Sequence, residues 1–478
     1  MKLNKSVNVI ICVYIALLFI YSFLISVKIQ SSQYIYNYDQ ARDTYVSYFI
    51  NKYHIAPQYP PWGSFRKEYH LKNNKIYYYL LAPFSFTNDG SSLLYFCSFW
   101  FVLAIPLVFI LTSLISNKYA GVLAATITFQ SGFIRNVSGL PLQPLFTPTI
   151  LLIFLIFLVL AKKYNSIWYF LFSSITLFLG IQFHLSFLRF VILYLWVFLG
   201  LFKEFKLKNR IFLILISLII FSLFLFLNTD FFDKYSITGA RIQMVSYKSF
   251  KEILLGGLMD DYMIIFGKNL VFLYLFLFFL IINFRKFKYN FLFFAFLFYP
   301  ISAIDSLTGL YTSPYIPFFI VLFSSIVLGL KNKFLFIFIL LLVIFFGQNK
   351  ITFQNFKNIK LTNPVATSQN FLSVITNDLN PIVKDITDYC VFKCDGGIIS
   401  FNVAYNFYKI QLGQTKESFF DSVCGDNSLI TNNKKNFLHS FSDDDCKLVF
   451  ENENNRQLYN FEKINSKEGR SIYLITRK

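Results

Sequence analysis

Long apolar runs recur along this chain, and they limit its possible folds more than any other feature. A helix needs about 20 mostly apolar residues to cross a bilayer, and eleven candidate stretches occur before residue 348. With 56% hydrophobic and 14% charged residues, the chain is too apolar for a soluble domain. The sequence therefore predicts an all-α polytopic membrane bundle whose spans cover 8–27, 91–115, 119–134, 143–161, 166–183, 185–202, 211–228, 269–284, 290–303, 314–330 and 332–347.

Positive charges in the short connections predict how the bundle is oriented. With a cytoplasmic N-terminus, the inner segments carry fourteen Lys and Arg side chains against one acid, Glu204. Such enrichment marks cytoplasmic loops, so the long outer loops and the tail are expected outside. No small-residue cleavage site follows the first run, which we interpret as a retained anchor. The fourteen cations are Lys2, Lys5, Lys118, Lys162, Lys163, Lys203, Lys206, Lys208, Arg210, Arg285, Lys286, Lys288, Lys331 and Lys333.

The formal net charge of +19 also reflects the Lys and Arg side chains of the predicted cytoplasmic segments. After residue 347 the chain holds 16 Lys and Arg against 14 Asp and Glu, so the excess lies in the membrane part. A topology bias of this kind requires no nucleic-acid partner. The expected surroundings are a lipid bilayer.

The tail has a different pattern from the part that precedes it. Residues 366–389 can form one helix, and three short strands are expected at 396–405, 446–453 and 471–478. Asn, Asp and Gly turns separate these strands. We predict a transmembrane domain over 1–347 and a small extracytoplasmic α/β domain over 348–478.

Cysteines are also unevenly distributed. Cys12 and Cys97 lie in spans and are expected to be packing residues. An even number of tail cysteines on an oxidising face permits two disulfides, and a zinc site is the alternative, although no His lies at ligand spacing. The pairing is open, with a bond within one helix disfavoured by geometry; the four tail cysteines are Cys390, Cys394, Cys424 and Cys446.

The first outer loop, residues 28–90, carries the most unusual polar cluster. Asp39 and Asp43 are four residues apart, so a helix would bring both carboxylates to one face with Arg42 beside them. Aromatic residues repeat at the same spacing before a proline-rich segment, which favours an amphipathic helix along the membrane surface. These aromatic residues are Tyr45, Phe49 and Tyr53.

Further polar residues fall on the same predicted outer face. Arg135 lies in a Gly- and Pro-rich break, and Gln182, His184 and Arg189 lie where two spans meet. Ionisable groups at membrane depth are costly unless they are paired or used. We interpret these cations, with Arg241 of the loop 229–268, as candidates for holding an anionic headgroup. Interfacial anchoring of the arginines and a structural role for the histidine are the alternatives.

Taken in order, these features resemble the GT-C class of integral-membrane glycosyltransferases. The likeness is to the bacterial branch similar to protein O-mannosyltransferases and the lipid A aminoarabinose transferase. That family has an acidic motif after its first span, here Tyr38-Asp39-Gln40-Ala41-Arg42-Asp43. It also has a tyrosine-rich stretch before the second span, here Tyr77-Tyr78-Tyr79, although the family's His-Gly-Pro is missing. Arg135-Asn136 and Gln182-Phe183-His184 follow in the family's order.

The resemblance implies a polyprenyl-phosphate sugar as donor and an inverting transfer in a bacterial cytoplasmic membrane. The acceptor would be a lipid, a glycan or a protein. An Asp of the first outer loop acts as general base in the family, and Asp39 matches it by position. The candidate acceptor or donor pocket comprises His70, Lys75, Tyr79, Gln182 and Tyr315.

The chemistry of the residues agrees with that implication. A lipid-phosphate donor brings its own leaving group, so the protein must supply a carboxylate for the acceptor proton and cations for the departing phosphate. The candidate catalytic residues are Asp39 and Asp43. No cofactor is required, although carboxylates and histidines can hold a divalent cation, so metal dependence is open. The candidate phosphate-binding residues are Arg42, Arg135, His184, Arg189 and Arg241.

Two other functions fit a polytopic chain with charges at one face. A transporter or flippase of lipid-linked saccharides would use the charges as a pathway, but no inverted repeat is visible. A surface polysaccharide polymerase or ligase would share the lipid donor, but it would not predict the pair of acids in the first loop.

Overall fold

The structure is a computed structural model, and its backbone forms two compact units. The first comprises Met1–Lys28, Lys72–Tyr77 and Tyr95–Lys360, and the second comprises Ile29–Leu71, Tyr78–Leu94 and Leu361–Lys478. The structure describes residues 5–33, 38–54, 75–87, 91–131, 143–183, 187, 190–227, 265–266, 270–283, 315–328, 333–346, 389–394, 398–400, 435–440, 457, 459–467 and 470–477.

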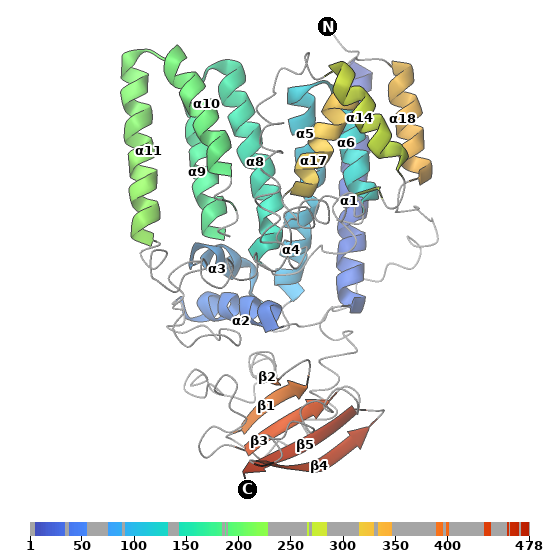
Figure 1. The fold of residues 1–478 in the computed structure, drawn as a ribbon, viewed down its shortest axis with the longest axis vertical. Coiled ribbons are helices and arrows are strands. Elements are labelled where there is room, and N and C mark those ends of the chain that lie inside the picture. The colour runs from blue at the N-terminus through green and yellow to red at the C-terminus, as the bar shows by residue number, and fades with distance from the viewer. Residues whose placement is uncertain are drawn as a thin grey trace. The chain divides into compact units, whose positions relative to one another are not determined.

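The first unit is a bundle of helices that run alongside one another (Figure 1). Pairs of neighbours in sequence, such as α5 with α6 and α8 with α9, pack against each other, and α17 packs against both α5 and α6. The helices of the bundle are α1 (Lys5–Gln33), α4 (Ser91–Val102), α5 (Ala104–Ile115), α6 (Lys118–Gln130), α8 (Gln143–Tyr164), α9 (Ile167–Phe183), α10 (Val191–Glu204), α11 (Leu207–Leu227), α14 (Val271–Asn283), α17 (Tyr315–Val327) and α18 (Lys333–Phe346).

The lengths and composition of these helices support a multi-pass membrane protein. Within the described residues, Ser6–Val27, Ser92–Ile115 and Leu145–Tyr164 are long and apolar enough to cross a membrane. Shorter apolar helices include Ile167–Phe183 and Phe334–Phe345. The count of eleven spans stays a prediction, since 290–303 lies outside the described residues.

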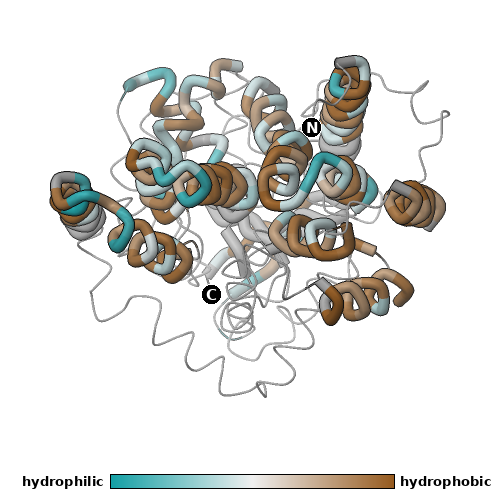
Figure 2. The backbone as a smooth tube through the Cα atoms, turned by 90° about the horizontal axis from the view of Figure 1, so that it is seen from above, coloured by the Kyte–Doolittle hydropathy of each residue, from teal (hydrophilic) through white to brown (hydrophobic). Residues whose placement is uncertain are grey.

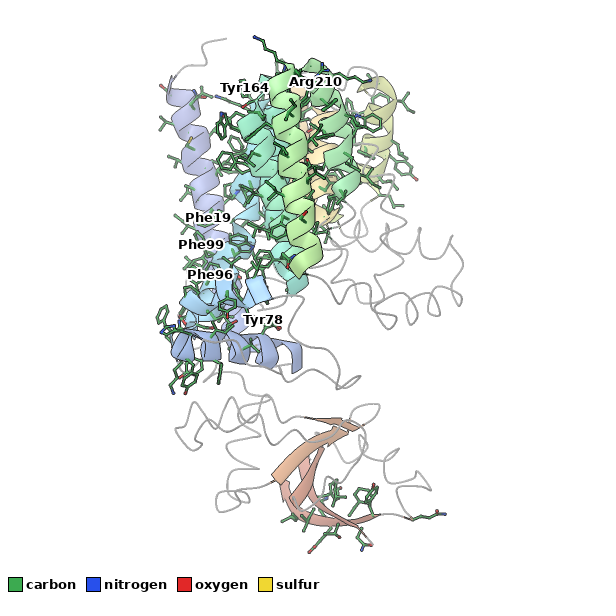
Figure 3. The ribbon with its side chains drawn as sticks, turned by 90° about the vertical axis from the view of Figure 1, so that its left-hand side faces the viewer. Phe19, Tyr78, Phe96, Phe99, Tyr164 and Arg210 are labelled. Atoms are coloured by element: carbon green, nitrogen blue, oxygen red, sulfur yellow. The ribbon has the colours of Figure 1, made fainter. Side chains whose placement is uncertain are left out.

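Cationic side chains gather at one end of the bundle. They lie at the start of α6, at the ends of α8 and α10, and at the start of α11, and Lys118 Nζ donates a hydrogen bond to Asn8 Oδ1 of α1 (2.7 Å). Figure 2 shows brown helices with teal at several of their ends, and Figure 3 shows Tyr164 and Arg210 at the same end. This is the charge distribution that the positive-inside pattern requires; which side of the membrane it faces stays a prediction. The cations are Lys118, Lys162, Lys163, Lys203, Lys206 and Arg210.

Arg210 illustrates why cations occur at these ends. Its Nε donates to Phe205 O (2.7 Å) and its Nη2 donates to Lys203 O (3.0 Å). The last carbonyls of a helix lack intrahelical partners and carry partial negative charge. Arg210 thereby closes α10 and ties it to the first turn of α11.

The close contact of α5 and α6 depends on a glycine. A Cβ atom at Gly121 would lie 2.1 Å from Ser113 Oγ and 2.8 Å from Phe109 O. Small residues allow membrane helices to approach closely. At the start of α6, Asn117 accepts a hydrogen bond from Ala120 N (3.1 Å) and donates to Leu328 O (2.9 Å), which joins α6 to the residue after α17.

The second unit contains short helical segments and a sheet. Its helices are α2 (Tyr38–Tyr53), the last four residues of α3 (Lys75–Leu81), and η1 (Ala82–Phe84). The five-stranded sheet has the order β2-β1-β3-β5-β4, with β1 and β3 parallel and the other pairs antiparallel. Its strands are β1 (Tyr389–Cys394), β2 (Ile398–Ser400), β3 (Lys435–Ser440), β4 (Tyr459–Lys467) and β5 (Arg470–Arg477).

The tail prediction is partly corrected by this sheet. Strands β2 and β5 fall where strands were expected, but β1, β3 and β4 were missed. The helix expected over 366–389 is wrong at its end, because Tyr389 begins β1. Residues 366–388 and 446–453 lie outside the described residues. The α/β class of the tail and its boundary at residue 348 therefore stay predictions.

The corrected secondary structure also changes which disulfides the tail cysteines can form. Cys390 and Cys394 lie on one strand, where a rise of about 3.3 Å per residue separates their Cα atoms by about 13 Å. A disulfide needs Cα atoms within about 7 Å, so these two residues cannot pair with each other. Cys424 and Cys446 lie outside the described residues. Cys97 is buried as expected, whereas Cys12 is exposed, which contradicts its expected packing role.

Candidate active site

The predicted acid-bearing helix exists as α2. Its 16 residues include both acids, so helical spacing places Asp39 one turn before Asp43 on the same face. The rings of Phe49 and Tyr53 contact each other with centroids 4.7 Å apart, as the spacing predicted. The helix ends at Tyr53, and the next residue, His54, has a φ of 61° and donates its N–H to Ile50 O (2.8 Å).

Of the two candidate acids on α2, Asp43 is the one whose side chain the structure describes. Its exposed fraction is 0%, as is that of Tyr78. The Tyr78 hydroxyl donates a hydrogen bond of 2.8 Å to Asp43 Oδ1, and Figure 3 shows Tyr78 next to α2. A buried carboxylate is costly unless it is hydrogen-bonded, and a phenol donor to an ionised oxygen is among the stronger hydrogen bonds.

Other contacts fix α2 against the segment that follows α3. Asn51 Nδ2 donates to Ala82 O of η1, and Ser47 Oγ donates to Asp43 O within the helix (2.7 Å). Val46 and Ile50 are buried on α2. The helix is thus held through a carboxylate near its start and an amide near its end.

Hydrogen bonds connect the residues after η1 to the start of α4. Ser92 Oγ accepts from the backbone N–H groups of Phe86 and Thr87 (both 3.2 Å). In return, Ser92 N–H donates to Thr87 Oγ1 (3.0 Å). Reciprocal side-chain and backbone bonds of this kind satisfy helix-start donors, and they tie Phe86 and Thr87 to the start of α4.

An aromatic cluster lies in the first unit. Tyr77 of α3 contacts the rings of Phe146 and Phe183 edge-on, with centroids 5.3 and 5.5 Å away. Phe146 stacks on Phe183 and on Trp100, each at 5.9 Å. Trp100 Nε1 donates to Phe146 O (3.3 Å), and Thr149 Oγ1 donates to Trp100 O (2.9 Å). These bonds join α3, α4, α8 and α9 around Tyr77.

The remaining predicted residues fall into three groups. Gln182 is buried beside Phe183, and Tyr79 is 46% exposed on α3. The side chains of Asp39, Arg42, Lys75 and Tyr315 are not described, although their backbones lie in α2, α3 and α17. Among the described residues no three His, Cys, Asp or Glu side chains form a group that could hold a metal ion, so metal dependence stays open. Outside the described residues lie His70, Arg135, His184, Arg189 and Arg241.

Sequence reasoning missed the hydrogen bond between Asp43 and Tyr78. The sequence did single out Tyr77-Tyr78-Tyr79, but nothing in it distinguished which tyrosine meets the acid. Tyr77 lies among rings, Tyr78 bonds a carboxylate, and Tyr79 is exposed. On a helix consecutive residues point about 100° apart, so three adjacent tyrosines necessarily meet three different environments.

The fold belongs to the type found in GT-C integral-membrane glycosyltransferases, which confirms the resemblance predicted from the sequence motifs. One such structure is ArnT from Cupriavidus metallidurans in the apo state. It matches this chain with a TM-score of 0.57 at 12% identity, over 98% of each chain.

A second match is the oligosaccharyltransferase of Archaeoglobus fulgidus tethered with an acceptor peptide containing the NVT sequon. The TM-score is 0.50 at 12% identity, over 96% of this chain and 74% of that one. In the zinc and sulfate complex of that enzyme the TM-score is 0.48 at 13% identity, and the match covers 87% of this chain and 59% of the other. No protein-family model and no curated protein sequence matches the chain.

Proposed function

We propose that this protein is a membrane glycosyltransferase that moves a sugar from a polyprenyl-phosphate donor to an acceptor hydroxyl on the extracytoplasmic face. The observation that carries the proposal is the end-to-end likeness of the fold to ArnT, over 98% of both chains. In this chain, helix α2 with its two acids follows the first apolar helix. The acceptor is a lipid, a glycan or a protein.

The proposed reaction inverts the sugar carbon in one displacement. The Asp39 carboxylate takes the proton of the acceptor hydroxyl as that oxygen attacks the anomeric carbon. The bond from this carbon to the phosphate oxygen breaks, and polyprenyl phosphate leaves with the bonding electron pair. The proton remains on Asp39 until solvent removes it, so the step is balanced without a further reactant.

Cations are proposed to stabilise the phosphate as its negative charge develops. These cations are Arg42, Arg135, His184, Arg189 and Arg241, and a pocket of His70, Lys75, Tyr79, Gln182 and Tyr315 is proposed to surround the substrates. Asp43 receives a different role from Asp39. Because its carboxylate is buried and accepts the Tyr78 hydroxyl, it is better suited to hold α2 than to exchange protons with an acceptor.

The orientation completes the proposal. The cationic end of the bundle is assigned to the cytoplasm of a bacterial cell, which places the N-terminus inside and the tail outside. Donors of this kind carry their phosphate at the membrane surface, where loop 28–90 is proposed to meet it.

A reconstituted assay tests this function. Purified protein in proteoliposomes is supplied with a panel of polyprenyl-phosphate sugars and a lipid, glycan or peptide acceptor, with and without a chelator. We expect one class of donor to yield a new glycosidic bond. The chelator arm decides metal dependence. Movement of lipid-linked saccharide across the bilayer with no product from any donor would instead identify a flippase.

A further inference from the structure

Hydrogen bonds from two places on α2 reach the segment 78–84, one in the first half of the helix and one near its end. Tyr78 bonds the side chain of Asp43, and Asn51 bonds the backbone of Ala82. Asn51 follows Asp43 by eight positions, which correspond to about 12 Å along a helix. Only the first bond is close to Asp39, which precedes Asp43 by one turn.

The bond at Asp43 is unlike ordinary helix packing. A carboxylate and a phenol that are both 0% exposed must each be removed from water, and this is unfavourable unless they pair well. Apolar side chains of similar volume would pack there at lower cost. In some proteins, buried polar pairs fix one arrangement over its alternatives, and a pair at this position would favour one placement of α2.

A fixed Asp43 sets the rotation of α2 about its own axis. Successive residues on a helix turn by about 100°, so Asp39 lies about 40° from Asp43 around the axis. A rotation or a shift that moved one of these positions would move the other with it. The hydrogen bond at Asn51 is about three turns away from Asp39 and restrains the far end of the helix.

We propose that Tyr78 is a positioning residue: by holding the Asp43 carboxylate it fixes the rotation of α2 and thereby the place of Asp39 at the reacting atoms. This inference rests on the proposed function, because it gives Asp39 a proton to accept. Because Tyr78 is 0% exposed, the proposal gives it no contact with either substrate. Its hydroxyl acts through Asp43 and the helix backbone.

The test uses Tyr78→Phe, which removes one oxygen and keeps the ring, in the full-length protein in proteoliposomes. A small misplacement of a catalytic group can cost about 10²-fold. We therefore expect kcat to fall by about 10-fold to 100-fold while the KM for the acceptor is unchanged. Asn51→Ala is the matched control, since it removes a different hydrogen bond between the same two segments. It should keep the wild-type kcat.

A double variant identifies the route of the effect. If Tyr78 acts only through Asp43, Tyr78→Phe combined with Asp43→Asn should be no slower than the slower single variant. Multiplying effects would show that Tyr78 acts elsewhere and would overturn the inference. A wild-type kcat in Tyr78→Phe, or an equal loss in Asn51→Ala, would also overturn it.

Hydrogen exchange separates this inference from the proposed function. Tyr78→Phe and Asp43→Asn should each speed amide exchange in residues 38–46 of α2, and Asn51→Ala should not. If wild-type protein transfers no sugar from any donor while this exchange pattern appears, the function has failed and the hold on α2 stands. Unchanged exchange in both variants would overturn the positioning role whatever the activity.

Discussion

The acid-bearing segment and the interior of the bundle both bury a tyrosine hydroxyl, and they give it different partners. In the second unit, the Tyr78 hydroxyl donates to a carboxylate, Asp43 Oδ1, at 2.8 Å. In the first, the Tyr194 hydroxyl of α10 lies 2.9 Å from Ser174 Oγ and 3.3 Å from Ser217 Oγ. Hydroxyls can exchange partners and donor roles with one another, whereas an ionised carboxylate only accepts.

This difference separates a bond that specifies geometry from one that contributes modestly to packing. Interhelical hydrogen bonds in membrane proteins average about 0.6 kcal/mol. Removing a hydrogen-bond donor from a buried carboxylate costs more, because the desolvation of the charge is then less well offset. We therefore expect the two regions to respond differently to the same small substitutions.

The largest effect is expected at Asp39. Asp39→Asn keeps the shape of the side chain and removes the proton acceptor, so kcat should fall by about 10²–10⁴-fold while the protein still inserts and folds. Initial rates of transfer, with circular dichroism as a folding check, provide the measurement. Asp43→Asn should cost less. A fully active Asp39→Asn would move the base to Asp43, and an active double variant would remove the mechanism.

The second largest effect is expected from removing the ring of Tyr77. This residue is 0% exposed and lies between Phe146 and Phe183. Truncating a large buried aromatic side chain destabilises a protein by about 3–5 kcal/mol. Tyr77→Ala should therefore lower the thermal unfolding midpoint of the detergent-solubilised protein. Tyr79→Ala, two residues along and 46% exposed, is the control for stability; an equal drop there would contradict the assignment of Tyr77 to the core.

The smallest effect is expected at Tyr194. Tyr194→Phe removes the hydroxyl that joins α9, α10 and α11, and we expect a loss of about 0.6 kcal/mol with unchanged kcat. Parallel unfolding and transfer measurements on Tyr194→Phe and Tyr78→Phe compare the two regions directly. The distinction between the two regions is wrong if Tyr194→Phe and Tyr78→Phe both lower stability without changing kcat. It is also wrong if both lower kcat without changing stability.

The parts of this fold that follow from short-range patterns could be predicted. Asp39 and Asp43 are four residues apart, as are Phe49 and Tyr53, and α2 spans both pairs. Apolar runs likewise matched α8 and α9 closely, because a membrane helix satisfies its own backbone and depends little on distant residues.

Long-range pairings could not be predicted in the same way. Strand β1 pairs in parallel with β3, where Tyr389 meets Lys435, and no local pattern links segments that far apart. The bond between Asp43 and Tyr78 joins residues 35 positions apart. The spacing of the acids identified Asp43, and three consecutive tyrosines identified the segment that holds Tyr78. Only the packed structure shows which of the three tyrosine hydroxyls reaches the carboxylate.

The most direct test of the account is the stoichiometry of transfer in proteoliposomes that contain only this protein, one donor and one acceptor. Released polyprenyl phosphate and glycosylated acceptor are both quantified by mass spectrometry over the first turnovers. We predict one molecule of polyprenyl phosphate for each new glycosidic bond, with both products lost together in Asp39→Asn. Donor that crosses the bilayer intact, with no phosphate released from it and no acceptor modified, would contradict the claim that this protein is a glycosyltransferase.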